Sequence, residues 1–403
     1  MSSLGTDLKR NLEPSDYGLL RASFQLDPQI DCGIFVGRHD IRERLEDRLK
    51  RAHLTKSSMH SIIWGDYGSG KTHTLNYVQR YLGQLKVDAL PIFVRAPRIQ
   101  EKSTPSDLYA SIMESISTSA LLDLFAKIYD QQSELQKTTD HFQRVAIIDK
   151  IVQNKDLSVV IHKYNKSRPQ EDYLVVKWLS GQKLSAKERE TLGVISDNAD
   201  QFTASKTILS ILQLFSQFEK KFVLLMIDEM ESIELVKEKR ELEFEKFLRP
   251  IADEKQAISL LIAFSHDGTI ESGPRIFQPK QALGGRVGYP QNYINLMPFD
   301  SPASMECFVA ELMNAKGIRD PSVDIDSLIK KGERETDEKL SRAYFPFTDE
   351  ATALMFQLFQ QATTPRLVSP RAILKSMTEC LGEAMNQGKL AITTEIVQKV
   401  LGE

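Results

Sequence analysis

The chain has 403 residues, more than one compact core of ordinary size, so its length favours two or three structural units. Hydrophobic residues make up 41% and charged residues 27% of the chain, which excludes wholesale disorder and a fibrous architecture. A formal net charge of -3 excludes a global electrostatic attraction to nucleic acid or to anionic membranes.

The cysteines and the apolar runs bear on where the protein works. The 3 cysteines stand far apart, which indicates neither a zinc site nor a redox pair and favours a reducing cytoplasm. The N-terminal residues lack the basic start and the apolar core of a secretory signal. Apolar runs reach about a third of the roughly 20 residues that a membrane-spanning helix needs, so we expect a cytoplasmic protein without a membrane partner.

Three regions differ in their sequence pattern. Residues 1–30 are polar with little periodicity and predict an N-terminal arm, either extended or a short helix that packs on the core. Residues 31–300 alternate strand and helix patterns, except that residues 119–204 are helical and charged throughout and predict a helical insertion. Residues 301–403 show helix patterns only and predict a small helical lid domain.

Short apolar runs mark the strands of the core. The run at residues 222–227 is unbroken, which is typical of a central parallel strand that is covered on both faces. Other strands are expected at residues 61–64, 90–95, 258–264 and 293–297, with helices at 39–54, 73–82, 106–117 and 205–218. The lid helices are expected near residues 302–315, 349–361, 370–386 and 393–402, and residues 330–339 as a loop or an exposed helix. The alternation predicts an α/β fold, a parallel sheet covered by helices.

A glycine-rich segment joins the first strand to the helix that follows it. It reads Gly65-Asp66-Tyr67-Gly68-Ser69-Gly70-Lys71-Thr72, with His73 at the start of the helical pattern. Gly65, Gly68 and Gly70 allow backbone N–H groups to converge on a phosphate, as in a P-loop. Lys71 would reach the β- and γ-phosphates of ATP, and the Thr72 hydroxyl would bind Mg²⁺ at a helix start that favours anions. The alternative is a glycine-rich turn that holds no ligand.

An acidic pair, Asp228-Glu229, follows the unbroken apolar run. The carboxyl end of a parallel strand faces the ligand crevice, so Asp228 is expected to hold Mg²⁺ through water. Glu229 is expected to orient and deprotonate the attacking water, a role that needs a carboxylate within hydrogen-bond reach. The alternative is an acidic pair that stabilises a helix start through the helix dipole.

Upstream of the P-loop, Ile34-Phe35-Val36-Gly37-Arg38 resembles a segment of the AAA+ ATPases, in the branch of origin-recognition ATPases, transposition regulators and STAND signalling ATPases. The resemblance implies a P-loop NTPase fold. It also implies that Phe35, Val36 and Gly37 line the adenine pocket.

The same resemblance implies three further roles. Ser265, at the end of the fourth core strand, would sense the γ-phosphate, although many relatives have Asn there. Arg286, in a glycine-containing segment, would serve as an arginine finger to a neighbouring subunit; the alternative is a surface arginine on a flexible loop, and Arg275 lies nearby. Arg371 follows Ser369 and Pro370 at a helix start and would reach back to the nucleotide, with Arg366 as a weaker rival.

A narrower resemblance involves the helical insertion. Lys177-Trp178-Leu179-Ser180-Gly181 and the residues after it are similar to ATP-binding proteins of bacterial BREX-type phage-defence islands. The alternative is that Trp178 merely anchors a helical hairpin.

Three functions stay open at this point. The first is an ATPase that assembles with other copies or partners and switches a DNA-linked machine, in phage defence or a related process. The second is an ATP-dependent regulator of transposition or replication that binds duplex DNA directly. The third is a nucleotide-gated interaction module with little hydrolysis, against which Glu229 argues. No helix-turn-helix or zinc pattern indicates a DNA-reading element.

Overall fold

The computed structural model describes residues 12–97, 103–131, 140–164, 169–255, 257–266, 269, 272–361 and 368–402. The chain divides into two compact units. The sheet unit comprises residues 45–64 and 81–295, and the lid unit comprises residues 1–44, 65–80 and 296–403. Each unit is described by itself.

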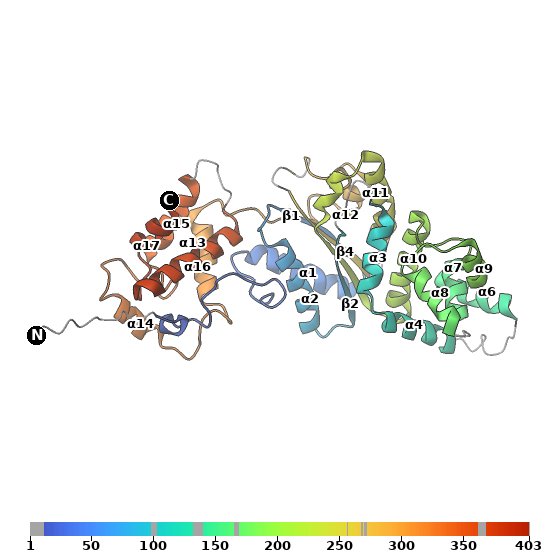
Figure 1. Cartoon of the computed structure of the whole chain (residues 1–403), viewed down its shortest axis with the longest axis horizontal. Helices are drawn as coiled ribbons and strands as arrows, with labels where there is room; N and C mark the ends of the chain where they lie inside the picture. The colour runs from blue at the N-terminus through green and yellow to red at the C-terminus, as the bar shows by residue number, and fades with distance from the viewer. Residues whose placement is uncertain are drawn as a thin grey trace, which may run out of the picture. The chain divides into compact units, whose positions relative to one another are not determined.

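A five-stranded parallel sheet forms the centre of the sheet unit (Figure 1). Its order is β2-β3-β4-β1-β5, and the pairings of β2 with β3, β3 with β4 and β1 with β5 are parallel. The strands are β1 (His60–Gly65), β2 (Ala89–Arg95), β3 (Phe222–Asp228), β4 (Ile258–Ser265) and β5 (Tyr293–Asn295). This sheet confirms the α/β prediction.

The burial of β3 explains its unbroken apolar sequence. Every residue of the strand is buried, because β2 and β4 flank it and helices cover the sheet. Among these helices, α3 packs against β2 and α11 against β4.

The helices of the sheet unit outside the insertion are the C-terminal part of α1 (His39–Thr55), the end of α2 (Lys71–Gln84), α3 (Pro105–Ser115), α10 (Gln201–Gln213), α11 (Glu238–Asp253) and α12 (Ala282–Val287). Shorter segments are the π-helix η2 (Leu214–Phe218) and the 3₁₀ helices η3 (Met230–Leu235) and η4 (Arg275–Phe277).

The described residues between 118 and 200 form helices joined by short turns and loops. These helices are α4 (Thr118–Gln131), α6 (His141–Val152), α7 (Lys155–Tyr164), α8 (Pro169–Leu179) and α9 (Ala186–Leu192). Trp178 is fully buried and donates its indole N–H to the carbonyl oxygen of Ser196 (2.9 Å). The Asn198 amide donates to the carbonyl oxygen of Trp178 (3.0 Å), so Trp178 anchors the insertion core.

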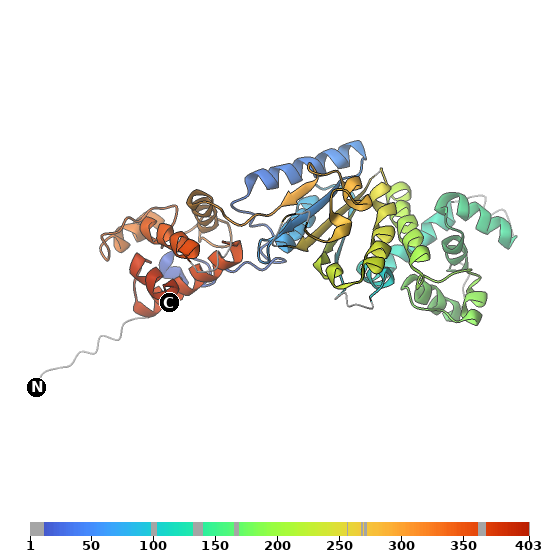
Figure 2. The same ribbon diagram turned by 90° about the horizontal axis from the view of Figure 1, so that it is seen from above.

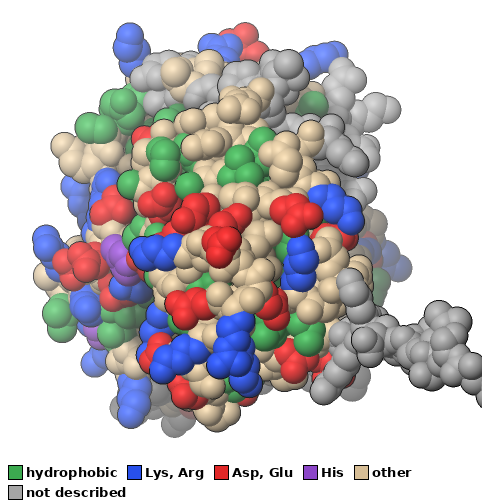
Figure 3. Space-filling model, turned by 90° about the vertical axis from the view of Figure 1, so that its left-hand side faces the viewer, with side chains coloured by type: hydrophobic (Ala, Val, Ile, Leu, Met, Phe, Trp, Pro, Cys, Tyr) green, Lys and Arg blue, Asp and Glu red, His purple; other side chains and the backbone are tan. Residues whose placement is uncertain are grey.

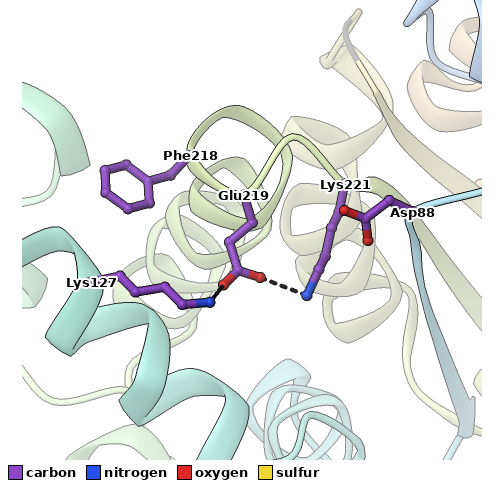
Figure 4. A pocket seen from close by; sticks show the side chains of 5 residues that line it. All are labelled: Asp88, Lys127, Phe218, Glu219 and Lys221. Atoms are coloured by element: carbon purple, nitrogen blue, oxygen red, sulfur yellow. Dashed lines mark hydrogen bonds and ion pairs between the residues drawn. The ribbon is translucent and has the colours of Figure 1, made fainter. Parts of the chain in front are cut away.

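A small hollow lies where the insertion joins the sheet (Figure 4). It encloses about 300 Å³ and is lined by Asp88, Lys127, Phe218, Glu219 and Lys221. The Glu219 carboxylate lies between the ammonium groups of Lys127 (2.7 Å) and Lys221 (2.6 Å). The ion pairs compensate these charges, so the cluster ties α4 to the start of β3.

The lid unit is built from helices and the N-terminal arm (Figure 2). Its helices are α13 (Pro302–Met313), α14 (Ile325–Gly332), α15 (Asp349–Gln361), α16 (Pro370–Gln387) and α17 (Thr394–Leu401), with a 3₁₀ turn η1 (Pro14–Tyr17) in the arm. Tyr17 and Phe24 of the arm are fully buried in the lid core, and Tyr17 donates to the carbonyl oxygen of Lys389 (2.7 Å). The arm is therefore part of the lid fold. Among the described helices, none is long and apolar enough to span a membrane.

Candidate functional site

The glycine-rich segment has the backbone conformation that its glycines allow. Gly65 ends β1, and Gly68 and Gly70 have φ angles of 82° and 100°, which side-chain-bearing residues rarely adopt. A Cβ atom on Gly65 would lie 2.6 Å from the carbonyl oxygen of Leu296. The segment therefore turns sharply from β1 into α2, with Lys71 as the first residue of the helix.

The side chain of Lys71 points back into this loop. Its ammonium group donates to the carbonyl oxygens of Gly65 (2.9 Å) and Asp66 (2.7 Å) and lies 3.4 Å from the Ser69 hydroxyl. Lys71 is buried, so these carbonyl groups stabilise a desolvated charge. A phosphate that entered the loop would offer the ammonium group a stronger, charged acceptor in their place.

The segment at residues 34–37 lies against the first turns of α2. Phe35 is buried, with its ring centroid 4.7 Å from that of Tyr77 and 6.5 Å from that of His73. His73 donates its ring N–H to the carbonyl oxygen of Ile34 (2.8 Å). Burial lowers the pKa of His73, although this hydrogen bond opposes the shift. The structure thus brings the predicted adenine segment next to the P-loop helix.

Arg371 also lies beside the P-loop. Ser369 caps α16 by accepting the N–H of Ala372 (3.2 Å), which confirms the expected helix start. The N–H of Arg371 donates to the carbonyl oxygen of Gly68 (3.4 Å), and its guanidinium carbon lies 4.7 Å from the ring centroid of Tyr67. The rival Arg366 falls outside the described residues.

Asp228 is the last residue of β3, and Glu229 comes directly after it. Asp228 is buried, and its carboxylate accepts the N–H of Glu229 (3.0 Å). Glu229 has a φ angle of 61°, a left-handed conformation that is uncommon outside glycine, and its side chain is exposed. Strained backbone of this kind is concentrated at functional sites.

A third carboxylate near the end of β3 was not among the site residues predicted from the sequence. Glu231, in η3, accepts the backbone N–H of Ser265 (3.0 Å) at the end of β4. The signal was present, because the sequence Asp-Glu-Met-Glu carries three acidic residues in four positions. Ser265 therefore has a carboxylate partner from the turn that follows Glu229.

The strand order shows which strand ends lie at the same edge of the sheet. β1 and β3 lie on either side of β4, and parallel strands present their carboxyl ends at one edge. Gly65 and Asp228 are the last residues of β1 and β3. In the described part of the chain, no group of three or more His, Cys, Asp or Glu side chains is arranged to hold a metal ion.

Both arginines of the predicted finger region are engaged within this chain. Arg286 pairs with Asp253 and donates to the carbonyl oxygen of Ala282 (2.8 Å). Arg275 pairs with Glu238 (2.5 Å). Arg286 lies on α12 and not on a flexible loop. Gly284 of the same helix packs so closely that a Cβ atom there would lie 2.1 Å from the carbonyl oxygen of Gln278.

A family model described as BREX system ATP-binding protein BrxC/D matches residues 28–399. The chain belongs to this family. It is therefore an ATP-binding protein by family, and the resemblance to BREX-type ATP-binding proteins is confirmed. No curated protein sequence matches the chain.

Several solved structures are similar to the chain at low identity. The Aeropyrum pernix Orc1 protein in complex with DNA is 13% identical, with a TM-score of 0.44 over 91% of this chain and 65% of its own. Drosophila ORC bound to DNA is 12% identical, with a TM-score of 0.46 over 100% of this chain and 67% of its own. The Thermotoga maritima RuvB branch migration motor is 11% identical, with a TM-score of 0.38 over 91% of this chain and 70% of its own. The chain thus spans about two thirds of the length of these proteins.

Proposed function

We propose that the protein binds ATP with Mg²⁺ at the segment of residues 65–72, hydrolyses it, and acts as a nucleotide-driven switch or assembly factor in a DNA-linked bacterial system such as phage defence. The observation that carries this proposal is the placement of Lys71. Its buried ammonium group is held inside the loop by two backbone carbonyl groups, where a phosphate would replace them. The membership in an ATP-binding family supports the same conclusion.

Each predicted site residue has its own proposed role in hydrolysis. Glu229 takes a proton from a water molecule, whose oxygen attacks the γ-phosphorus while the bond from that phosphorus to the β–γ bridging oxygen breaks. Lys71 stabilises the negative charge on the phosphates, and Ser265 orients the γ-phosphate. Mg²⁺ held by Thr72 and Asp228 would neutralise further phosphate charge. The products are ADP and inorganic phosphate.

The base would lie against Phe35, Val36 and Gly37, beside the P-loop helix. The ring of Phe35 offers an apolar face for a purine, and its contacts with Tyr77 and His73 hold that ring next to α2. Arg371 would contact the γ-phosphate from the N-terminus of α16, since its backbone already contacts Gly68. These positions support a pocket for ATP and ADP.

Self-association and duplex DNA belong to the proposal as partners. An arginine finger acts on a neighbouring subunit, and Arg286 is the candidate whose release from Asp253 would make it available. On the face drawn in Figure 3, basic and acidic side chains are interspersed. Ion pairs such as Lys339 with Asp349 and Lys399 with Glu383 neutralise charge in the lid unit. Interspersed charges of both signs do not attract the phosphate backbone of DNA strongly. We therefore propose duplex DNA as a stimulator of ATP hydrolysis.

Equilibrium dialysis with radiolabelled ATP and Mg²⁺ tests the nucleotide site directly. We expect saturable binding by the wild-type protein and loss of binding by Lys71→Ala. Lys187→Ala, which removes an exposed lysine of α9 in the insertion, is the matched control and should bind normally. Tight ATP binding by the Lys71 variant would overturn the assignment of the site.

A further inference from the structure

Helix α13 of the lid holds the segment at residues 37–39. One carboxylate of α13, that of Glu311, makes most of these contacts: Oε2 accepts the backbone N–H of Gly37 (2.6 Å), and Oε1 accepts from the ring of His39. The thiol of Cys307, one turn earlier on α13, donates to the same carboxylate (3.2 Å). Burial would raise the pKa of Glu311, but these hydrogen bonds outweigh it and lower the pKa, so the carboxylate is ionised.

The same helix also fixes the shape of the backbone at Gly37. Gly37 has a φ angle of 70°, and a Cβ atom there would lie 2.9 Å from the Cβ atom of Phe308. The next residue is held as well, because the Arg38 guanidinium donates to the carbonyl oxygen of Met297 (2.8 Å). Gly37 therefore has no room for a side chain where it lies against α13.

On its other side, the segment contacts the helix of the P-loop. The carbonyl oxygen of Ile34 accepts from His73, and the Phe35 ring packs against Tyr77. Residues 34–37 thus run from a hydrogen bond with α2 to a hydrogen bond with Glu311 of α13. The position of the Phe35 ring depends on both ends being fixed.

We propose that Glu311 is a positioning residue for the nucleobase, which holds residues 35–37 in the shape that receives adenine. The inference rests on the proposed nucleotide site. Glu311 contacts the backbone of the segment at Gly37, and through this contact it acts on the base. A hydrogen bond to a charged group is worth on the order of a factor of ten in an equilibrium constant, which sets the size of the expected effect.

The test compares ATP with inorganic tripolyphosphate, which carries phosphates but no base. Dissociation constants of both are measured for the wild-type protein, Glu311→Ala and Glu311→Gln, together with their melting temperatures. We expect Glu311→Ala to weaken ATP binding about tenfold and to leave tripolyphosphate binding within about twofold. Glu311→Gln retains an acceptor for the Gly37 N–H, so its loss of ATP affinity should be smaller.

Glu306→Ala is the matched control, because it removes a glutamate from another face of α13. It should leave both affinities unchanged. Unchanged ATP affinity in Glu311→Ala, or an equal loss for ATP and tripolyphosphate, would overturn the inference and leave Glu311 as a structural contact. If the alanine variant does not fold, the same comparison is decided by Glu311→Gln. A wild-type protein that binds neither ligand would instead overturn the proposed nucleotide site.

Discussion

The guanidinium group of Arg371 lies over the ring of Tyr67, with its carbon 4.7 Å from the ring centroid. Tyr67 belongs to the glycine-rich loop and Arg371 to the first turn of α16, more than three hundred positions later in the sequence. Stacking on a ring face leaves the N–H donors at the edge of the guanidinium plane available. The contact therefore holds Arg371 beside the phosphate loop before a nucleotide arrives.

Removal of the Tyr67 ring should weaken ATP binding. An exposed cation–π contact contributes about 0.5 to 1 kcal/mol, which corresponds to roughly a two- to fivefold loss of affinity in Tyr67→Ala. Tyr67→Phe keeps the ring and should bind ATP normally. The measurement is a double-mutant cycle with Arg371→Ala, in which the Tyr67 change should have no further effect. Additive losses would show that the two residues act independently.

Glu229 and Glu231 can be separated by matched amide substitutions. Glu229→Gln should keep ATP bound and lower turnover by about 10² to 10⁴, the usual contribution of a general base. Glu231→Gln should retain more turnover, since its carboxylate accepts the backbone N–H of Ser265 and an amide oxygen can replace that acceptor. Single-turnover hydrolysis checks both variants. Greater loss in Glu231→Gln than in Glu229→Gln would reverse the two roles.

Two inactive variants should complement each other if Arg286 acts across a subunit interface. We expect Lys71→Ala to lose nucleotide binding, and Arg286→Ala to keep its own site but to be unable to serve a neighbour. Mixed together, they should recover part of the ATPase activity, because an arginine finger can contribute about 10³ to 10⁵ in rate. Arg275→Ala, whose arginine pairs with Glu238, is the control for a nearby arginine. If the mixture recovers no activity, Arg286 does not act on a neighbouring subunit, and its pair with Asp253 is only a contact within one chain.

His60 should make stability depend on pH. Its Nδ1 accepts the N–H of Leu260 (3.2 Å), its Nε2 donates to the carbonyl oxygen of Glu254 (3.3 Å), and burial lowers its pKa. A lowered pKa means that the neutral ring stabilises the fold above the unfolded value of about 6.5, and that this contribution is lost as the pH falls through the folded value.

Melting temperatures at pH 7.5 and pH 5.5 measure this dependence. His60→Gln keeps a donor for the carbonyl oxygen of Glu254 and does not titrate, so its melting temperature should fall less on acidification than that of the wild type. His141→Gln, which changes an exposed histidine of α6, should behave like the wild type. Equal falls for the wild type and His60→Gln would contradict the prediction.

The strands were predictable from the sequence, whereas some helices were not. Unbroken apolar runs located β3 and β4, because both strands are buried on both faces. Helix α11 was not singled out, since its many charges obscure apolar residues at helical spacing, Phe244, Phe247, Leu248 and Ile251. The helix α14 was also missed, because its apolar residues Ile325, Leu328 and Ile329 keep helical spacing over only eight residues, too short a segment for a distinctive pattern.

The site could be predicted only where it is contiguous in the sequence. The P-loop and Asp228-Glu229 have local patterns, and so does the cap at Ser369. The contact of Glu311 with Gly37 joins residues 274 positions apart, and no local sequence pattern at either residue predicts the contact. Tyr17 and Phe24 gave no periodic signal either, although both contribute to the lid core. Such contacts depend on tertiary packing and not on local propensity.

We propose that this chain turns over ATP at the P-loop with Glu229 as the base. Steady-state ATP hydrolysis, measured against protein concentration with and without duplex DNA and beside Glu229→Gln, tests it most directly. We predict turnover well above that of the variant, with specific activity that rises with concentration or with DNA. Flat turnover at the level of Glu229→Gln under every condition would contradict the account.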